Sequence, residues 1–185
     1  MRKTILLTAI SFLMASTICF SQEKTVDQYK LLATTRTSTM QKEIDETAAQ
    51  GYRILVGAPT SGSEMALFLA RDGTVSDPYK YKLLATGRTG TMQKELNEVA
   101  DAGYRLIPST MISKQQFMGG IEVVMILEKP PKIMHYYEYK LLATSRTSTL
   151  QKEVTEAKDA GFLIVGMVSR GENIVVMERP RPVTP

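Results

Sequence analysis

The sequence YKLLATTRTSTMQKE at Tyr29–Glu43 returns as YKLLATGRTGTMQKE at Tyr81–Glu95 and as YKLLATSRTSTLQKE at Tyr139–Glu153. Twelve of the fifteen positions are identical in all three copies, and the copies begin 52 and 58 residues apart. Each copy continues into a glycine followed by an aromatic residue, and then into short apolar runs. Identity at this spacing indicates repeated supersecondary units.

Each copy predicts a strand, a helix and a hairpin of two strands. Tyr29–Thr34 shows the alternation of a short strand. The hydroxyl groups of Thr37-Ser38-Thr39 are candidate N-caps of the helix, and Gln41 follows Ser38 in capping-box spacing. Gly51 and its two equivalents stand where a left-handed glycine ends a helix. Several of the later strands are apolar at nearly every position, which indicates burial on both faces.

These units predict an α+β fold, in which three tandem βαββ repeats pack as one compact pseudo-threefold body. Each repeat is expected to have one helix and a three-stranded, mostly antiparallel sheet, with neighbouring copies covering the sheet face that its own helix leaves open. The right-handed crossover rule places the third strand between the first and the second. The expected boundaries are 1–21 for a signal peptide, 29–72, 81–130 and 139–180 for the repeats, and 181–185 for a loose tail.

The N-terminus has the pattern of an export signal. Two basic residues precede an uncharged stretch, Thr4–Gln22, which has an apolar centre and the small residue Ser21 near its end. This order predicts cleavage near Ser21/Gln22 and a periplasmic or secreted protein, with no transmembrane segment after cleavage. Two alternatives stay open: a permanent membrane anchor, and a lipoprotein acylated at Cys19.

The composition excludes several classes of protein. Residues 1–21 carry only two charges, Arg2 and Lys3, so their removal leaves 164 residues with 21 basic and 19 acidic side chains. A chain so close to neutral is not expected to bind nucleic acid by neutralising phosphates. His135 is the only histidine, and the sequence has no phosphate loop, nucleophile elbow or zinc-protease motif. We therefore expect no enzyme, no cofactor and no metal site.

Two repeats end in a strand that closes in a basic residue and proline, at Glu128-Lys129-Pro130 and Glu178-Arg179-Pro180. With the opening Tyr-Lys and the glycine–aromatic pair after the helix, most of each repeat resembles a bacterial family of small domains of unknown function, the one catalogued under the number 4177. Two features depart from that family: Tyr or Phe follows the glycine where the family often has Trp, and the first copy closes in Ala70-Arg71-Asp72 without proline. The resemblance implies a fold and assigns no activity and no functional residue.

The positions that match in all copies are largely polar, whereas apolar helix positions vary, as Ile44, Leu96 and Val154 do. One hypothesis is that each repeated arginine, ahead of a helix N-terminus, forms an anion-binding notch with nearby threonines and a lysine. The other is that the anion is internal, a glutamate at position 43, 95 or 153 that pairs with the arginine. The candidate ligand-binding residues are Arg36, Thr37, Thr39, Lys42, Arg88, Thr89, Thr91, Lys94, Arg146, Thr147, Thr149 and Lys152.

The second hairpin, at 109–120, is longer than the others and carries apolar residues beside a polar tip. Its candidate partner-contact residues are Met111, Ile112, Phe117 and Met118. Exposed, they would mark an interaction surface; the alternative is that both strands extend and these residues join the core.

The sequence as a whole favours an exported, non-enzymatic binding or assembly module at the cell envelope, with an unknown protein or envelope component as its partner. One alternative is a small-ligand or anion-binding protein that uses the three notches. The other is an enzyme built from lysine, tyrosine and carboxylate groups at the repeat interfaces.

Overall fold

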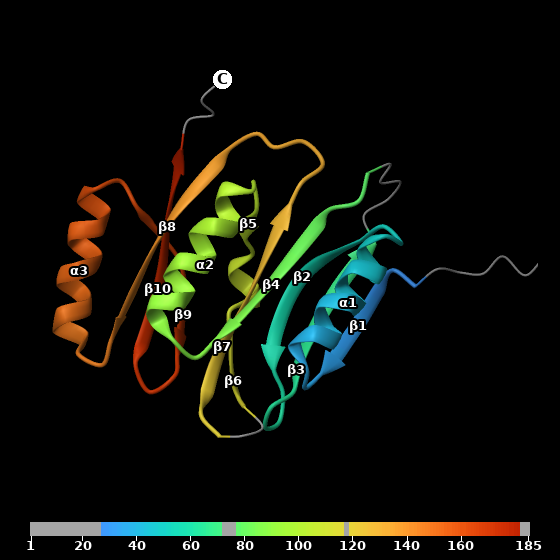
Figure 1. The fold of residues 1–185 in the computed structure, drawn as a ribbon, viewed down its shortest axis with the longest axis horizontal. Helices are drawn as coiled ribbons and strands as arrows, with labels where there is room; N and C mark the ends of the chain where they lie inside the picture. Colours follow the sequence, from blue (N-terminus) through green and yellow to red (C-terminus); the bar gives the residue numbers. More distant parts are fainter. Residues whose placement is uncertain (1–26, 72–76, 117–118, 182–185) are drawn as a thin grey trace, which may run out of the picture.

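The computed structural model describes residues 27–71, 77–116 and 119–181, and this part of the chain has an α+β fold (Figure 1). It contains three α-helices and three antiparallel sheets, two of three strands and one of four. The predicted signal peptide, its cleavage site and Cys19 lie outside the described residues, as do Asp72, Phe117, Met118 and 182–185.

The elements fall into three units in chain order. Unit 1 contains β1 (Tyr29–Thr34), α1 (Thr37–Ala48), β2 (Tyr52–Pro59) and β3 (Met65–Arg71). Unit 2 contains β4 (Lys80–Thr86), α2 (Thr89–Asp101), β5 (Arg105–Leu106), the short 3-10 helix η1 (Pro108–Thr110), β6 (Ile112–Gln115) and β7 (Ile121–Lys129). Unit 3 contains β8 (Tyr136–Thr144), α3 (Thr147–Asp159), β9 (Leu163–Ser169) and β10 (Asn173–Arg181).

The last strand of each unit lies at the centre of its sheet. The strand orders are β1-β3-β2, β4-β7-β5 and β8-β10-β9, and each central strand runs antiparallel to both neighbours. This confirms the predicted place of the third strand. Unit 2 differs from the prediction, because β5 is only two residues long and β6 adds a fourth strand on β7.

The third unit extends further than the sequence predicted. Arg181 belongs to β10 and pairs in register with Tyr136 of β8. The predicted start of the loose tail at residue 181 is therefore wrong. The reason is that Tyr136 and Tyr137 lengthen β8 and give the end of β10 a partner strand.

The three helices end as predicted. Gly51, Gly103 and Gly161 follow them with φ angles of 85°, 87° and 89°, the left-handed conformation that only glycine adopts without strain.

The central strands of units 2 and 3 are buried on both faces. In β7, Val123, Met125 and Leu127 belong to the core cluster under α2, whereas Val124 and Ile126 belong to the cluster of unit 1. The strand β10 repeats this arrangement between unit 2 and α3. Each of these two sheets therefore has its own helix on one face and the preceding unit on the other, as the doubly apolar strand pattern predicted.

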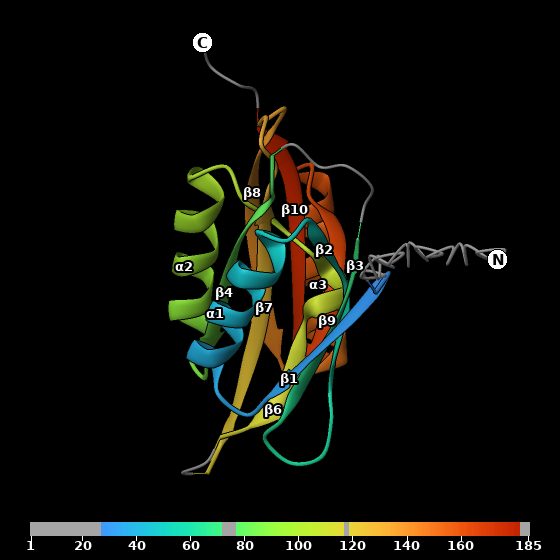
Figure 2. The same cartoon turned by 90° about the vertical axis from the view of Figure 1, so that its right-hand side faces the viewer.

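The units form an open row, so the predicted pseudo-threefold arrangement of one compact body is wrong. Figure 1 shows α1, α2 and α3 spread along the long axis, and in Figure 2 α1 and α2 lie on one side of the sheets. One core cluster joins units 1 and 2 and another joins units 2 and 3, while no cluster of the described residues joins units 1 and 3. The packing has a direction, because each sheet is covered by the unit before it. Within the described ranges, no unit covers the outer sheet face of unit 1 or the outer face of α3.

Candidate functional site at the junctions between units

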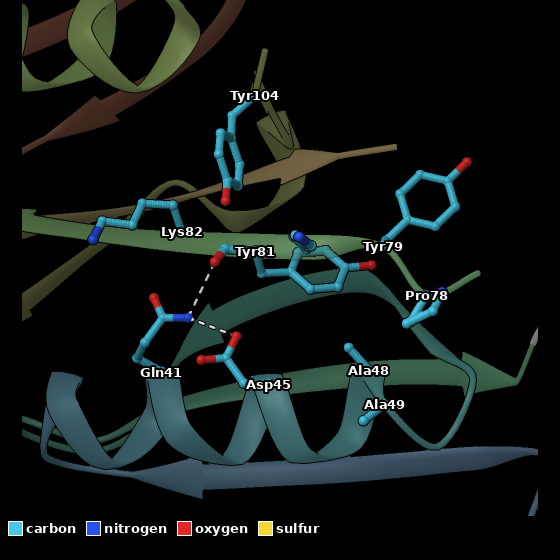
Figure 3. Close-up of a pocket in the computed structure, with 10 residues that line it drawn as sticks. Gln41, Asp45, Ala48, Ala49, Pro78, Tyr79, Tyr81, Lys82 and Tyr104 are labelled. Atoms are coloured by element: carbon cyan, nitrogen blue, oxygen red, sulfur yellow. Dashed lines mark hydrogen bonds between the residues drawn. The ribbon is translucent and has the colours of Figure 1, made fainter. Parts of the chain in front are cut away.

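The repeated glutamine joins each helix to the free edge of the next sheet. At the first junction, between units 1 and 2, Gln41 Nε2 donates to the Tyr81 carbonyl at 3.2 Å (Figure 3). Gln41 Oε1 accepts from the Leu83 N–H at 2.7 Å. At the second junction, between units 2 and 3, Gln93 makes the same two bonds to β8 at 2.8 and 2.6 Å. The side-chain amide thus supplies the donor and acceptor that a further strand would offer.

The repeated tyrosine at the start of each first strand fills the junction. Tyr81 and Tyr139 are buried, and their hydroxyls accept hydrogen bonds from the N–H groups of Ile54 at 3.3 Å and Leu106 at 2.8 Å in the preceding unit. Burial raises the pKa of both phenols well above the ordinary value of 10.0, because the phenolate would be poorly solvated there. Both side chains are therefore neutral hydrogen-bonding groups at physiological pH.

An arginine–glutamate pair crosses each junction. Arg53 Nη2 lies 2.7 Å from Glu128 Oε1, and Arg105 Nη2 lies 2.5 Å from Glu178 Oε1; in each pair the arginine Nε also donates to the other carboxylate oxygen. These hydrogen bonds raise the pKa of both arginines above their ordinary value. Each guanidinium also stacks on a tyrosine of the following unit, with its carbon 4.2 Å from the centre of one ring and 4.3 Å from the other. The pairs fix the register between neighbouring units.

The long hairpin of unit 2 lies inside the row, so the predicted partner contact is wrong for the two candidates that the structure describes. Ile112 is buried in the core of the first junction, and the partly buried Met111 packs against the core of the second. Lys114 is buried as well, with its Nζ 2.7 Å from Glu122 Oε1 and 3.1 Å from the Thr35 carbonyl. The cause is that β6 pairs with β7 and inserts between β2 and β9 of the flanking units.

The repeated arginines occupy the N-cap positions, where the sequence had predicted hydroxyl caps. Arg36, Arg88 and Arg146 have extended backbones and are exposed, and none of the three helices has a side-chain cap. Instead, the N–H of each arginine donates to the hydroxyl of the threonine two residues earlier, at 3.1–3.3 Å. A local Ser/Thr turn therefore explains why that threonine is repeated.

The other notch candidates belong to the first two turns of the helices. Helical residues one and three are the threonine pairs Thr37 and Thr39, Thr89 and Thr91, and Thr147 and Thr149. The lysines are exposed, and each lies 3.6–3.8 Å from the glutamate four residues later in its own helix. Such pairs contribute little to stability, so the repeated lysines are not explained by strong ion pairing.

The hypothesis of an internal anion named the wrong glutamates as partners of the repeated arginines. Among the described residues, no ion pair joins Arg36, Arg88 or Arg146 to Glu43, Glu95 or Glu153. The sequence offered no means of placing the helix starts against the loops of other units.

An internal anion does lie at one helix start. Thr89 Oγ1 donates to Glu172 Oε1 at 3.2 Å, and Arg170 Nη2 donates to the same oxygen at 2.8 Å. The hydrogen bond from Arg170 lowers the pKa of Glu172 below its ordinary range. The three helix starts are therefore not equivalent, because a loop of unit 3 supplies this carboxylate to α2. At α1 a cavity of about 380 Å³ lies beside Thr37, Ser38, Lys82 and Glu95 instead.

A second cavity lies in the first junction. It measures about 440 Å³ and is lined by α1, by the residues around β4 and by Tyr104, as Figure 3 shows. Its one carboxylate, Asp45, accepts a hydrogen bond from Gln41 at 3.0 Å. In the described ranges there is no group of three or more His, Cys, Asp or Glu side chains that could hold a metal ion. None of the helices found there has the length and apolarity needed to cross a membrane.

Sequence reasoning missed the residues that build the junctions. Gln41 was assigned to a capping box of its own helix and Gln93 received no role, although the identity of this glutamine in all copies was the available signal. Arg53 and Glu128 carried no such signal, because neither residue is present in all three copies.

Comparisons with protein families, with curated proteins and with solved structures give no match to this chain. The resemblance to the small domains of family 4177 therefore stays a prediction.

Proposed function

We propose that this chain is an exported repeat protein, without enzymatic activity, that binds or assembles protein at the cell envelope. The observation that carries this proposal is the exposure of large apolar side chains at both ends of the row. We call Tyr29, Leu31 and Phe68 of unit 1 the leading face, and Leu163, Ile164 and Met167 of unit 3 the trailing face. All six are at least 47% exposed. Apolar side chains gathered in this way mark interaction surfaces.

The use made of the polar groups supports a non-enzymatic role. The tyrosines and arginines whose pKa values are raised are hydrogen-bonded across the junctions, and the buried Lys114 is held by a carboxylate and a carbonyl. An enzyme built from lysine, tyrosine and carboxylates at these interfaces would need such groups to face a substrate. Here they hold neighbouring units together.

Anion binding is the second candidate function. One observation favours it: Arg36, Arg88 and Arg146 are exposed at helix starts, and none of them belongs to an ion pair of the described residues. The positive end of a helix dipole disfavours a cation unless an anion is near. A bound phosphate, sulfate or carboxylate would satisfy both groups.

Export and binding can be tested together in fractionated cells. N-terminal sequencing of the exported chain is expected to begin at or near Gln22; an intact Met1, a lipid on Cys19 or retention in the cytoplasm would overturn the export proposal. Crosslinking in the envelope fraction is expected to capture the same protein with the wild-type chain and with Met134→Lys, but not with Phe68→Lys. Met134 is a matched control because it is an exposed apolar residue outside both faces. Equal capture by all three chains would contradict a role for the leading face.

A further inference from the structure

We propose that the partner of the leading face is the trailing face of a second copy of this chain, docked head to tail in the geometry of the internal junctions. This inference rests on the proposed function and names its partner. Its support is that the two ends are the two halves of an interface that the row already contains twice.

The strand register shows that the leading face corresponds to surfaces buried inside the row. Tyr29 pairs in register with Ala70, and Leu31 with Phe68. The same positions in β4 and β7 are Tyr81, Glu128, Leu83 and Ile126, and in β8 and β10 they are Tyr139, Glu178, Leu141 and Val176. Tyr29 is 57% exposed, whereas Tyr81 and Tyr139 are 4% and 2% exposed. Phe68 is 47% exposed, whereas its equivalents Ile126 and Val176 are fully buried.

The trailing face shows the same difference. Ile164 is 57% exposed, whereas its equivalents Ile54 and Leu106 are 5% and 3% exposed at the two internal junctions. On α3, Leu150 and Val154 are only partly buried, although the matching methionines and aliphatic residues of α1 and α2 are fully buried. Unit 3 therefore presents the surface that units 1 and 2 use to cover a following sheet.

The third copy of the glutamine lacks the contact that its equivalents make. Gln151 is exposed, and among the residues that the structure describes its amide reaches only Thr155 of its own helix, at 3.4 Å. A β1 strand docked in the internal geometry would accept a hydrogen bond from Gln151 Nε2 at the Tyr29 carbonyl and donate one from the Leu31 N–H to Gln151 Oε1. The repeated glutamine would then have the same function in all three units.

The charges at the two ends have changed together. Where units 1 and 2 have Arg53 and Arg105, unit 3 has Leu163, which is 65% exposed. Where units 2 and 3 have Glu128 and Glu178, unit 1 has Ala70. Losing only the arginine would leave a largely buried carboxylate unpaired when the ends meet, since the glutamate side chains of the internal pairs are 20% and 9% exposed. When both charged residues are absent, Leu163 and Ala70 form an apolar contact in the docked interface. Such a pair is more stable buried in an interface than exposed to water.

Side-chain size is exchanged in the same manner. At the first junction, Gly57 leaves room for Ile112, since a Cβ at Gly57 would lie 3.0 Å from Ile112 Cδ1. By register, unit 3 has Met167 in place of Gly57, and unit 1 has Ala58 in place of Ile112. A large residue on the trailing face therefore faces a small one on the leading face, so the docked ends keep a similar packed volume.

Such an interface is heterologous, because it joins two different surfaces and leaves one of each free after every addition. The full-length chain is therefore expected to form species larger than a dimer, in amounts that grow with protein concentration. A symmetric contact between two leading faces, or between two trailing faces, would stop at the dimer.

The test uses Phe68→Lys to block the leading face and Ile164→Lys to block the trailing face. In sedimentation velocity over a range of concentrations, the wild-type chain and the control Met134→Lys are expected to assemble. Each blocked variant alone is expected to remain a monomer, and an equal mixture of the two is expected to give one discrete dimer, since each retains one intact face. Leu31→Lys and Met167→Lys provide a second pair if either variant has lost its native circular dichroism.

A wild-type chain that stays monomeric at all concentrations, or a blocked variant that dimerises alone, would overturn the inference. So would a mixture that forms no dimer. The proposed function can fail independently of this inference. If a monomeric chain captures a different envelope protein, the head-to-tail inference is refuted but the proposed function is supported. If the chain assembles head to tail but is found only in the cytoplasm, the proposed function is refuted.

Discussion

Replacing Gln41 by methionine removes the amide that joins α1 to the edge of β4, while keeping a similar side-chain length and helix propensity. Two hydrogen bonds across the junction are lost, each with a net contribution of about 0.5–1.5 kcal/mol, and the part-buried Leu83 N–H keeps no acceptor. The third bond of the amide, to Asp45 of its own helix, is exposed, and Gln151→Met removes the equivalent bond to Thr155. The expected loss in the free energy of unfolding is about 1–3 kcal/mol. Gln151→Met is the matched control, and its expected effect is below about 0.5 kcal/mol, because its amide contacts only its own exposed helix.

The loss in the free energy of unfolding caused by Gln93→Met should lie between the losses caused by these two variants. The Tyr139 carbonyl also accepts from Asn97 Nδ2 at 3.0 Å, so it keeps a partner when the glutamine is removed. The expected loss is about 0.5–2 kcal/mol. The assay is urea unfolding followed by far-ultraviolet circular dichroism, at a concentration where the chain is monomeric. If Gln151→Met destabilises as much as Gln41→Met, the glutamines act within their helices and the reasoning from the junctions is refuted.

The other predictions concern the single unit, the arginines and the tyrosines. A fragment of residues 26–76 should give a disordered or self-associating chain, because unit 1 alone loses the cover on α1 that unit 2 provides; a cooperatively folded monomer in size-exclusion chromatography and thermal melts would contradict this. Changing Arg36, Arg88 and Arg146 together to Gln should alter the unfolding free energy by less than about 0.5 kcal/mol per site, because all three are exposed and unpaired in the described chain. If they bind anions, phosphate raises the wild-type melting temperature but not that of the triple mutant, and equal responses would exclude the notches. Because burial raises the pKa of Tyr81 and Tyr139, their stabilisation is complete below the ordinary value of 10.0 and is lost as the pH rises beyond it. Tyr139→Phe should reduce this alkaline loss of stability in equilibrium unfolding, and a variant with the same alkaline loss as the wild type would contradict the role of the buried phenol.

Local patterns predicted the local structure well. The strand at Tyr29–Thr34, the helix after it and the glycine that ends it follow from residue types within a few positions of one another. The central place of the last strand followed from a general rule of chain crossover, which needs only the order of the elements.

The relations between units were harder to predict from sequence. A strand such as β7, apolar on both faces, reveals that a second cover exists, but it is equally compatible with a closed ring and an open row. To distinguish the two arrangements, one must know which surfaces of neighbouring units are in contact. Gln41 and Arg53 bind residues of the next unit, so their partners cannot be predicted without that knowledge. The prediction of hydroxyl caps was wrong for a local reason. The chain turns at Thr34 before the helix begins, and this turn places Arg36 at the N-cap position.

The arginine–glutamate pairs also bear on how such a chain could lengthen during evolution. Unit 2 alone contributes both partners, Arg105 toward unit 3 and Glu128 toward unit 1, whereas each terminal unit contributes one. A gene duplication of unit 2 would place a new Arg105 beside a new Glu128, and every pair in the longer array would remain complete. A duplicated unit 1 would instead set Arg53 against Ala70 and leave its partly exposed guanidinium without a carboxylate partner. The middle unit is therefore the one from which a longer array could grow by simple duplication.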